Sequence, residues 1–199
     1  MHCRGEAAPN LVFFMRRTLL LACLALSAVL QGCAERRIPT DFQAYADAPY
    51  TLGPGDRLRI IVFGQDSLSN SFAVDSSGHI SMPLIGAVPA TGRTSAALAR
   101  EIESRLRAGY IREPRVSVEV EAYRPFFILG EVTNSGQYPF VNGMSVETAV
   151  AIAGGYTPRA RKDLAQITRT QDGRTITGDV AVTMPVRPGD TIYIQERFF

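Results

Sequence analysis

The tripeptide Pro-Gly-Asp occurs twice, at residues 54–56 and 188–190, each time directly before a run of apolar and β-branched residues. Proline fixes φ at the second position of a β-turn, and glycine accepts the positive φ of the third position. Each copy is therefore predicted to be a tight turn that leads into a strand, over residues 58–63 and 191–195. Short strands between such turns, with helices among them, predict an α+β protein.

Gly53 and Gly55 also suggest a second interpretation, a phosphate-binding loop. A dinucleotide-binding fingerprint needs a third glycine and a helix directly after the loop. This segment has neither, since a predicted strand follows Asp56. Turn formation explains the glycines, and no cofactor site is expected.

The residues up to 123 predict further strands and one helix. Residues 72–74 and 79–81 flank Asp75-Ser76-Ser77-Gly78, a pattern typical of a β-hairpin. Residues 82–93 contain prolines and glycines and are predicted to be a loop. Thr94 can cap a helix that ends at Gly109 and carries one apolar stripe, made of Leu98, Ile102 and Leu106. Strict alternation over residues 115–123 predicts a half-buried strand.

Arg124-Pro125 interrupts this pattern and is predicted to separate two modules. The second module is predicted to begin with a strand at 126–129, a turn at 134–136 and a returning strand at 137–141. Ser145 is expected to cap a helix through Ala153, which Gly154-Gly155 end in the left-handed conformation. Residues 165–170 and 174–177 are expected to form a hairpin.

The N-terminus predicts an export signal. Met15, the expected true start, precedes two arginines, an apolar run over residues 19–30 and a cysteine at position 33. This run is shorter than the ~20 residues of a spanning helix, so residues 1–32 are predicted to be a signal peptide. Leu30-Gln31-Gly32-Cys33 resembles a bacterial lipobox, which implies that Cys33 is lipidated; the alternative is an ordinary signal with a chance cysteine at the cut. Residues 33–48 are predicted to be a lipidated N-terminus and linker.

Cysteine, histidine and charge counts exclude several classes of function. No cysteine follows Cys33, and the only histidines are His2 and His79. The later part of the chain therefore offers no disulfide, no zinc site and no cysteine nucleophile, and no catalytic or metal-binding residue is expected. Of 21 basic and 19 acidic side chains, three and one lie in residues 1–32, so 18 of each remain. A neutral body of this kind gives no indication of nucleic-acid binding.

Three groups of side chains could still form a site. His79, with Asp75 and Ser77 close in sequence, could act as a general base, although a surface histidine in a hairpin is the commoner case. Four helix-associated arginines could bind a glycan or phospholipid, but Glu101 and Glu103 at i,i+4 spacing favour a solvated helix face; these arginines are Arg93, Arg100, Arg105 and Arg107. Three tyrosines could stack on sugars, although packing is favoured: Tyr123, Tyr138 and Tyr156.

Several segments resemble the polysaccharide biosynthesis/export family, the Wza-type outer-membrane lipoproteins. The opening block Tyr50 to Leu58, the Asp75 to Ile80 segment and Pro83-Leu84-Ile85-Gly86 are similar to its export domain. In the second module, the segments that resemble a soluble-ligand-binding (SLBB) β-grasp domain are Leu129-Gly130-Glu131-Val132, Tyr138-Pro139, Ala153-Gly154-Gly155 and Pro188 to Tyr193. The resemblance covers about 150 of the 199 residues, in the family's order.

The resemblance implies a signal peptide, the linker, an export domain over residues 49–123 and a β-grasp domain over 124–199. It implies a non-enzymatic lipoprotein, held by its lipid on the periplasmic face of the outer membrane. As a homo-oligomeric ring, such a protein would conduct a capsule or exopolysaccharide together with an inner-membrane co-polymerase. Larger relatives continue into an amphipathic pore helix, which is not expected here, so a separate outer-membrane pore protein is an expected partner.

Two other function classes remain open. One is a periplasmic glycan-binding or scaffold lipoprotein that acts as a monomer. The other is a polysaccharide-modifying enzyme, which the lack of a carboxylate constellation disfavours. No residue is singled out as a glycan contact, and Phe198-Phe199 at the end of the sequence is expected to dock on the fold, a neighbour or a membrane partner.

Overall fold

The computed structural model describes residues 42, 48–171 and 173–197, which belong to one compact unit. The expected signal peptide, the lipidation site Cys33 and Phe198-Phe199 lie outside the described residues. Two domains follow one another in these residues, each with its own apolar core. Mixed sheets beside the helices α3 and α4 make the fold α+β, as predicted.

The first domain is built around the strand that follows the first Pro-Gly-Asp turn. This strand, β1 (Arg57–Val62), lies between β2 (Asn70–Ala73) and β5 (Val116–Ala122), and both neighbours are antiparallel to it. A short 3-10 helix, η1 (Asp66–Leu68), connects β1 to β2. Alternate residues of β1 are buried, as a strand with one core face requires.

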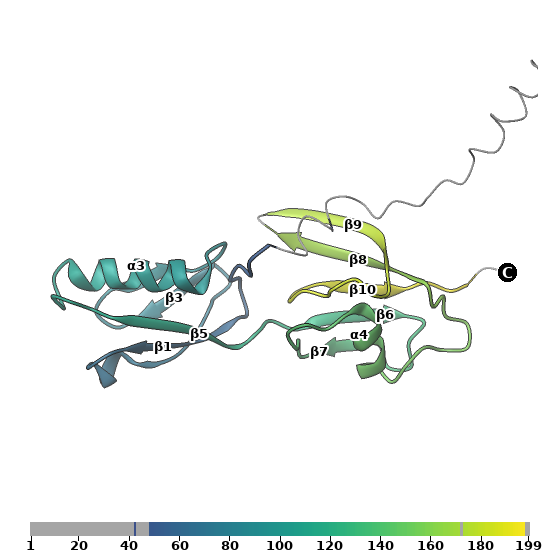
Figure 1. The fold of residues 1–199 in the computed structure, drawn as a ribbon, viewed down its shortest axis with the longest axis horizontal. Helices are drawn as coiled ribbons and strands as arrows, with labels where there is room; N and C mark the ends of the chain where they lie inside the picture. Colours follow the sequence, from purple (N-terminus) through teal and green to yellow (C-terminus); the bar gives the residue numbers. More distant parts are fainter. Residues whose placement is uncertain (1–41, 43–47, 172, 198–199) are drawn as a thin grey trace, which may run out of the picture. The chain divides into compact units, whose positions relative to one another are not determined.

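Helix α3 (Ser95–Arg107) packs against β5, as Figure 1 shows. Thr94 caps it as predicted, because its hydroxyl accepts a 3.2 Å hydrogen bond from Ala97 N. The predicted stripe Leu98, Ile102 and Leu106 is fully buried. The helix ends at Arg107, and Gly109 does not adopt the positive φ of a left-handed cap.

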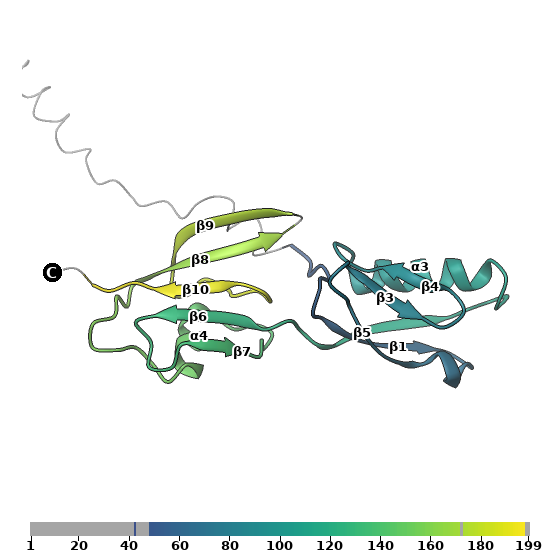
Figure 2. The same cartoon turned by 180° about the vertical axis from the view of Figure 1, so that it is seen from behind.

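The predicted hairpin of residues 72–74 with 79–81 is wrong in its pairing. The turn itself forms, with Gly78 at φ +82° and its N–H bonded to Asp75 O. However, β2 pairs with β1, while β3 (His79–Met82) pairs with β4 (Gly86–Pro89). Strand β4, labelled with β3 in Figure 2, lies where a loop was predicted, and its Val88 is fully buried in the core.

The second domain is a five-stranded sheet in the order β7-β6-β10-β8-β9 (Figure 1). The neighbours β6 and β10 are parallel, and the other three pairs are antiparallel. The bounds are β6 (Phe126–Gly130), β7 (Gly136–Tyr138), β8 (Leu164–Gln171), β9 (Arg174–Ala181) and β10 (Thr191–Ile194). The predicted hairpin of β8 with β9 is confirmed.

Helix α4 (Val146–Ile152) contributes Val146, Ala149 and Val150 to the core that also contains Ile128 and Ile192 of the sheet. Ser145 caps this helix as predicted, by accepting a hydrogen bond from Thr148 N. Gly154 and Gly155 both have positive φ, at +84° and +89°, which confirms the predicted helix end.

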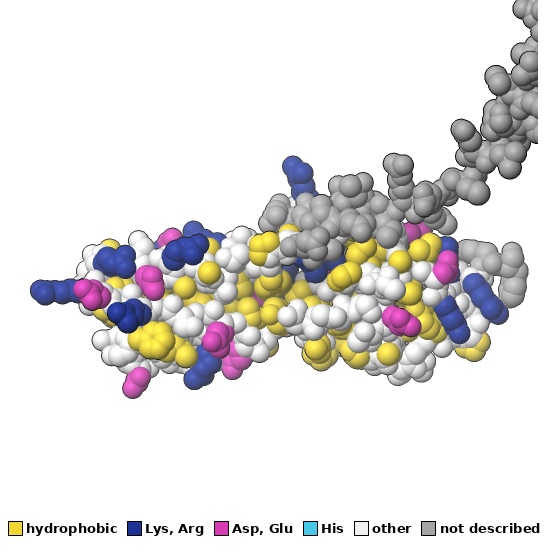
Figure 3. Space-filling view, in the orientation of Figure 1, with side chains coloured by type: hydrophobic (Ala, Val, Ile, Leu, Met, Phe, Trp, Pro, Cys, Tyr) yellow, Lys and Arg dark blue, Asp and Glu magenta, His cyan; other side chains and the backbone are white. Residues whose placement is uncertain are grey.

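None of the helices in the described part of the chain combines the length and the apolar character that crossing a membrane requires. On the face that Figure 3 presents, basic and acidic side chains are interspersed over the first domain. Such a surface has no large field of one sign, which agrees with the equal numbers of basic and acidic residues after position 32.

Candidate functional site

The two Pro-Gly-Asp turns have the same hydrogen-bonding pattern. Asp56 N donates to Gly53 O and Asp190 N donates to Arg187 O, both at 3.1 Å. In the reverse direction, Asp56 Oδ2 accepts from Gly53 N and Asp190 Oδ2 accepts from Arg187 N, both at 2.8 Å. The aspartates thus lock each turn with their side chains. Both are buried, with exposed fractions of 0% and 1%.

Each buried carboxylate also forms an ion pair with an arginine. Arg169 of β8 donates from Nε to Asp190 Oδ1 at 2.8 Å and from Nη2 to Oδ2 at 2.7 Å. This bidentate pair is buried on both sides, with the side chains 3% and 1% exposed. A buried carboxylate without such a partner would cost several kcal/mol.

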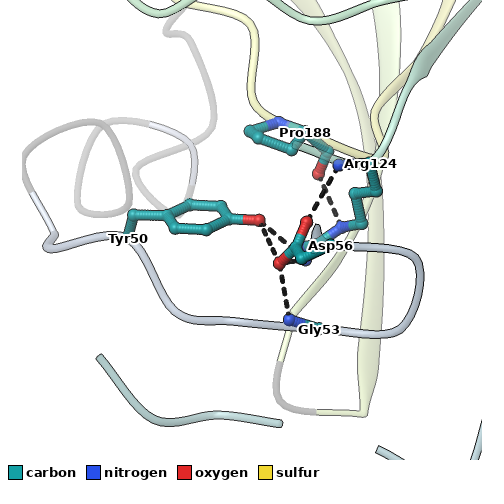
Figure 4. A network of polar contacts seen from close by, with 5 residues as sticks. All are labelled: Tyr50, Gly53, Asp56, Arg124 and Pro188. Carbon is teal, nitrogen blue, oxygen red and sulfur yellow. Dashed lines mark hydrogen bonds and ion pairs between the residues drawn. The ribbon is translucent and has the colours of Figure 1, made fainter. Parts of the chain in front are cut away.

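Arg124, between β5 and β6, is the arginine of the first turn and connects the two domains. Its N–H donates to Asp56 Oδ1 at 2.9 Å, and its Nη1 lies 3.3 Å from Asp56 Oδ2. Its Nε donates to the carbonyl of Pro188 in the second turn at 3.1 Å. Figure 4 shows this network, here called the Arg124 joint, which consists of Tyr50, Gly53, Asp56, Arg124 and Pro188.

Tyr50 completes the joint. Its hydroxyl donates to Asp56 Oδ2 at 2.6 Å and accepts from Arg124 Nη1 at 3.1 Å. Burial, together with the hydrogen bond to Asp56, raises the pKa of Tyr50 well above its ordinary value, so the hydroxyl remains a donor. The ring meets Tyr123 edge-on at 5.0 Å, and Tyr123 meets Phe140 in the same way at 5.4 Å.

Two glycines of the turns leave room for the Arg124 side chain. A Cβ at Gly53 would collide with Nη1 of Arg124, and one at Gly189 would lie 2.8 Å from its Nε. Gly189 also has a positive φ of +85°, whereas Gly53 does not need the conformational freedom of glycine. At Gly53, therefore, glycine is needed only because the Arg124 guanidinium occupies the space that a Cβ would take.

Open space borders the joint in two places. The first cleft, of about 410 Å³, is lined by Tyr50, Tyr123, Phe140, Asn142 and Arg187 among others. The second, of about 540 Å³, is lined by Thr51, Thr91, Arg124, Thr170 and Gly189 among others. Their walls offer aromatic rings, hydroxyls and guanidinium groups, which can bind a polar ligand, and among the described lining residues no nucleophile lies next to a base.

The candidate base His79 is the half-buried first residue of β3, directly after the turn at 75–78. Asp75 Oδ1 accepts hydrogen bonds from Ser77 N, Ser77 Oγ and His79 N, at 2.6–3.0 Å. The Ser77 hydroxyl thereby lowers the pKa of Asp75. These residues do come together, but the serine donates to the carboxylate and the contacts span at most four residues, which is the geometry of a stabilised turn.

The candidate arginine patch is divided by acidic residues. Arg93 and Arg105 both pair with Glu101, at 3.0 and 2.8 Å, and lower its pKa. Glu103 accepts a hydrogen bond from the backbone N of Val116. A solvated, salt-bridged helix face therefore describes α3 better than an anion-binding patch.

The three candidate tyrosines pack against different neighbours and do not form one site. Tyr138 stacks on Phe126 at 5.9 Å and donates to Asn134 O, and Tyr156 packs against the second core. Tyr123 also lines the first cleft. Packing is thus the main role of these rings, as predicted.

Comparison with known proteins agrees with the two-domain structure. Residues 44–121 match the sequence model of the polysaccharide biosynthesis/export protein family, and residues 125–180 match the SLBB domain. Arg124 lies between the two matched segments.

Three curated proteins illustrate the similarity. The exopolysaccharide production protein ExoF of Rhizobium meliloti is 31% identical over 162 residues, which cover 75% of this chain and 35% of that protein. The polysaccharide export outer membrane protein EpsA of Ralstonia nicotianae is 27% identical over 75% of this chain and 48% of its own length. The polysialic acid transport protein KpsD of Escherichia coli is 27% identical over 55% and 20%, so the chain spans between a fifth and a half of these relatives. The chain therefore carries a domain of the polysaccharide biosynthesis/export family followed by an SLBB domain.

Proposed function

We propose that this protein is a non-enzymatic component of a machine that exports a capsular or extracellular polysaccharide. The observation that carries the proposal is the succession of an export-family domain and an SLBB domain within one chain. Relatives with this similarity are named for polysaccharide production, export or transport. The described residues of the clefts beside the joint offer aromatic rings, hydroxyls and guanidinium groups, which can bind a polar ligand such as a glycan.

The Arg124 joint supports a scaffold in which the two domains keep a fixed relation. Domains joined by one short linker move relative to each other by default, unless their interface resists it. Here Arg124 donates to Asp56 in one domain and to Pro188 in the other, while Asp56 is fully buried. A conduit for a long polymer has to keep its lining in place while the chain passes, and such a tie serves that need.

The proposal includes the position of the protein in the cell envelope. Cys33 carries acyl chains that hold the protein on the periplasmic face of the outer membrane, since two or more chains give stable anchoring. Copies of the protein form a periplasmic ring around the glycan. An inner-membrane co-polymerase delivers the polymer to this ring, and an outer-membrane pore completes the path.

In-frame deletion of the gene in the producing strain, followed by complementation, tests this function. We expect extracellular polysaccharide to disappear and polymer to accumulate in the cell fraction, with recovery by the wild-type gene. Cys33→Ser should fail to restore export and should move the protein from the membrane pellet to the soluble fraction. Cys23→Ser, inside the apolar run, is the matched control and should restore both.

Unchanged secretion in the deletion strain would refute the export role. Secretion of a polymer with altered composition would instead indicate a modifying enzyme. Export that persists with Cys33→Ser would refute the lipid anchor while leaving the export role in place.

A further inference from the structure

Phe42 precedes the first domain in sequence but is buried in the core of the second domain. Its side chain is 1% exposed and lies in the apolar cluster that also contains Val180 and Val186. Phe42 and Ala48 are the two described residues of the segment that was predicted to be a linker. Ala48 contacts the second domain as well, because its carbonyl accepts a 2.6 Å hydrogen bond from Arg187 Nη2. The chain is therefore held on the second domain before it enters the first.

The ring of Phe42 covers a buried guanidinium group. The Cζ atom of Arg169 lies over this ring, 5.6 Å from its centroid. The Nε and Nη2 atoms of Arg169 bind Asp190 and the Pro185 carbonyl, whereas Nη1 is buried without a hydrogen bond among the described residues. The face of an aromatic ring attracts a cation, most strongly where water is excluded, and accepts N–H groups weakly. Phe42 therefore supplies a contact for a guanidinium that lacks one hydrogen bond.

Both contacts of this segment lead to the second Pro-Gly-Asp turn. Arg169, which Phe42 covers, holds the carboxylate of Asp190, and this carboxylate also accepts a 2.8 Å hydrogen bond from the backbone N of Arg187. Arg187 is in turn the residue whose side chain binds Ala48. The segment thus acts on the side chains of the first and the last residue of the turn.

The same turn binds the connection between the two domains. The carbonyl of Pro188 accepts a hydrogen bond from Arg124 Nε at 3.1 Å, as Figure 4 shows. The N–H of Gly189 donates to the carbonyl of Pro125, also at 3.1 Å. The position of the turn therefore determines where Arg124 lies, and with it the hydrogen bonds that Arg124 makes to Asp56.

From this arrangement we infer that Phe42 is a latch that keeps the Arg124 joint rigid. While the ring is in place, it shields the Arg169–Asp190 pair from water, and the turn holds Arg124. When the ring leaves, water reaches the guanidinium and weakens its attraction for the carboxylate, because the energy of two charges falls as the surrounding dielectric constant rises. The turn then loosens, and the two domains move more freely about the joint.

The latch couples the N-terminal segment to the geometry of the whole subunit. This inference goes beyond the proposed function and does not require lipidation. If Cys33 carries acyl chains, as proposed, a pull between the membrane and the protein acts on Phe42, nine residues after Cys33, before it reaches the first domain. The domains are then rigid in a resting subunit and mobile in one whose tether is pulled.

Hydrogen–deuterium exchange of the full-length protein, read out by mass spectrometry, tests the latch. Phe42→Ala should accelerate exchange in peptides covering residues 187–190 and 124–127 by on the order of tenfold, the effect of losing a desolvated cation–π contact. Phe42→Leu keeps an apolar side chain but removes the π face, so it should accelerate the same peptides by about threefold or more. Val150→Ala is the matched control, because Val150 is equally buried in the same core but lies on α4, and it should leave these peptides unchanged.

The pattern of exchange decides between a latch and an ordinary core residue. Faster exchange at the turn and at residues 124–127, with α4 as slow as in the unmodified protein, would support the latch. Equal acceleration of the whole second domain by Phe42→Ala and Val150→Ala would overturn it, as would wild-type exchange in Phe42→Leu, which also serves if Phe42→Ala fails to fold. None of these outcomes depends on export, which the deletion strain tests separately.

Discussion

A buried aspartate in a turn needs more than its backbone donors. At Asp56 and Asp190 the turn N–H groups satisfy part of the carboxylate, but the negative charge remains in a site from which water is excluded. An arginine compensates that charge in both cases, by a partly exposed side chain at Asp56 and by a buried one at Asp190. The turn at Asp56 thus connects the two domains through Arg124, whereas the turn at Asp190 is held within the second domain by Arg169.

Gly53→Ala tests the space that the joint requires. The new Cβ would displace the Arg124 guanidinium, which would lose its hydrogen bonds to Tyr50, Asp56 and Pro188. We expect the free energy of unfolding, measured by urea denaturation, to fall by about 1–3 kcal/mol. Gly109→Ala is the matched control, because Gly109 also lacks a positive φ and its Cβ would meet nothing within 4 Å. Equal stability of both variants would contradict this account.

The turns could be predicted from sequence, whereas the roles of their aspartates could not. Proline and glycine determine the turn locally, and Gly55 and Gly189 have the positive φ that was expected. The arginine partners of the aspartates lie far away in sequence, 68 residues from Asp56 and 21 from Asp190. Local sequence predicts only a domain boundary at Arg124 and only a strand at Arg169. The repetition of the aspartate after Pro-Gly was the one available signal.

At the scale of elements, local patterns predicted the strands better than their partners. The apolar run of β1, the alternation in β5 and the caps of α3 and α4 depend on neighbouring residues, and these predictions hold. Pairing depends on the rest of the fold. Strand β2 precedes the turn at 75–78 as expected, but it pairs with β1, with Leu58 opposite Phe72, and not with β3. Strand β3 pairs with β4 instead.

Strand β4 and the parallel pair β6–β10 were missed for related reasons. The segment around β4 contains proline and glycine, which disfavour strands, but burial of Val88 and Ala90 outweighs that propensity. Parallel pairing of β6 with β10 joins the first and last strands of the second domain, a contact that no local pattern encodes.

Asp190→Asn tests the tie between β8 and the turn before β10. The substitution keeps the shape of the side chain but leaves the Arg169 charge buried without compensation. We expect urea denaturation to show a loss of about 3–5 kcal/mol in the stability of the second domain. Asp163→Asn removes a carboxylate from the exposed pair with Arg161 and should change stability by less than about 0.5 kcal/mol. A comparable midpoint for the two variants would show that the buried pair contributes little.

At the scale of the whole molecule, the Arg124 joint connects two successive domains and so bears on the geometry of a subunit in a larger assembly. Each domain has its own apolar core. What the joint adds is a defined connection through Arg124, which would give every subunit of an assembly the same geometry. Closed rings require such uniform subunits, because each contact must repeat with one rotation until the circle closes.

The mass of the native particle tests the proposed ring. Protein extracted from membranes in mild detergent should sediment as a particle several times the mass of one 21.7-kDa chain, after correction for bound detergent. Acyl chains could gather monomers in one micelle, so Cys33→Ser is the necessary control: without lipid, the protein should still assemble if protein surfaces make the contacts. Assembly should also survive added salt, because the surface carries balanced charges whose long-range attraction is weak. A lipid-free variant that sediments as a monomer at every concentration would refute the ring and favour a monomeric glycan-binding scaffold.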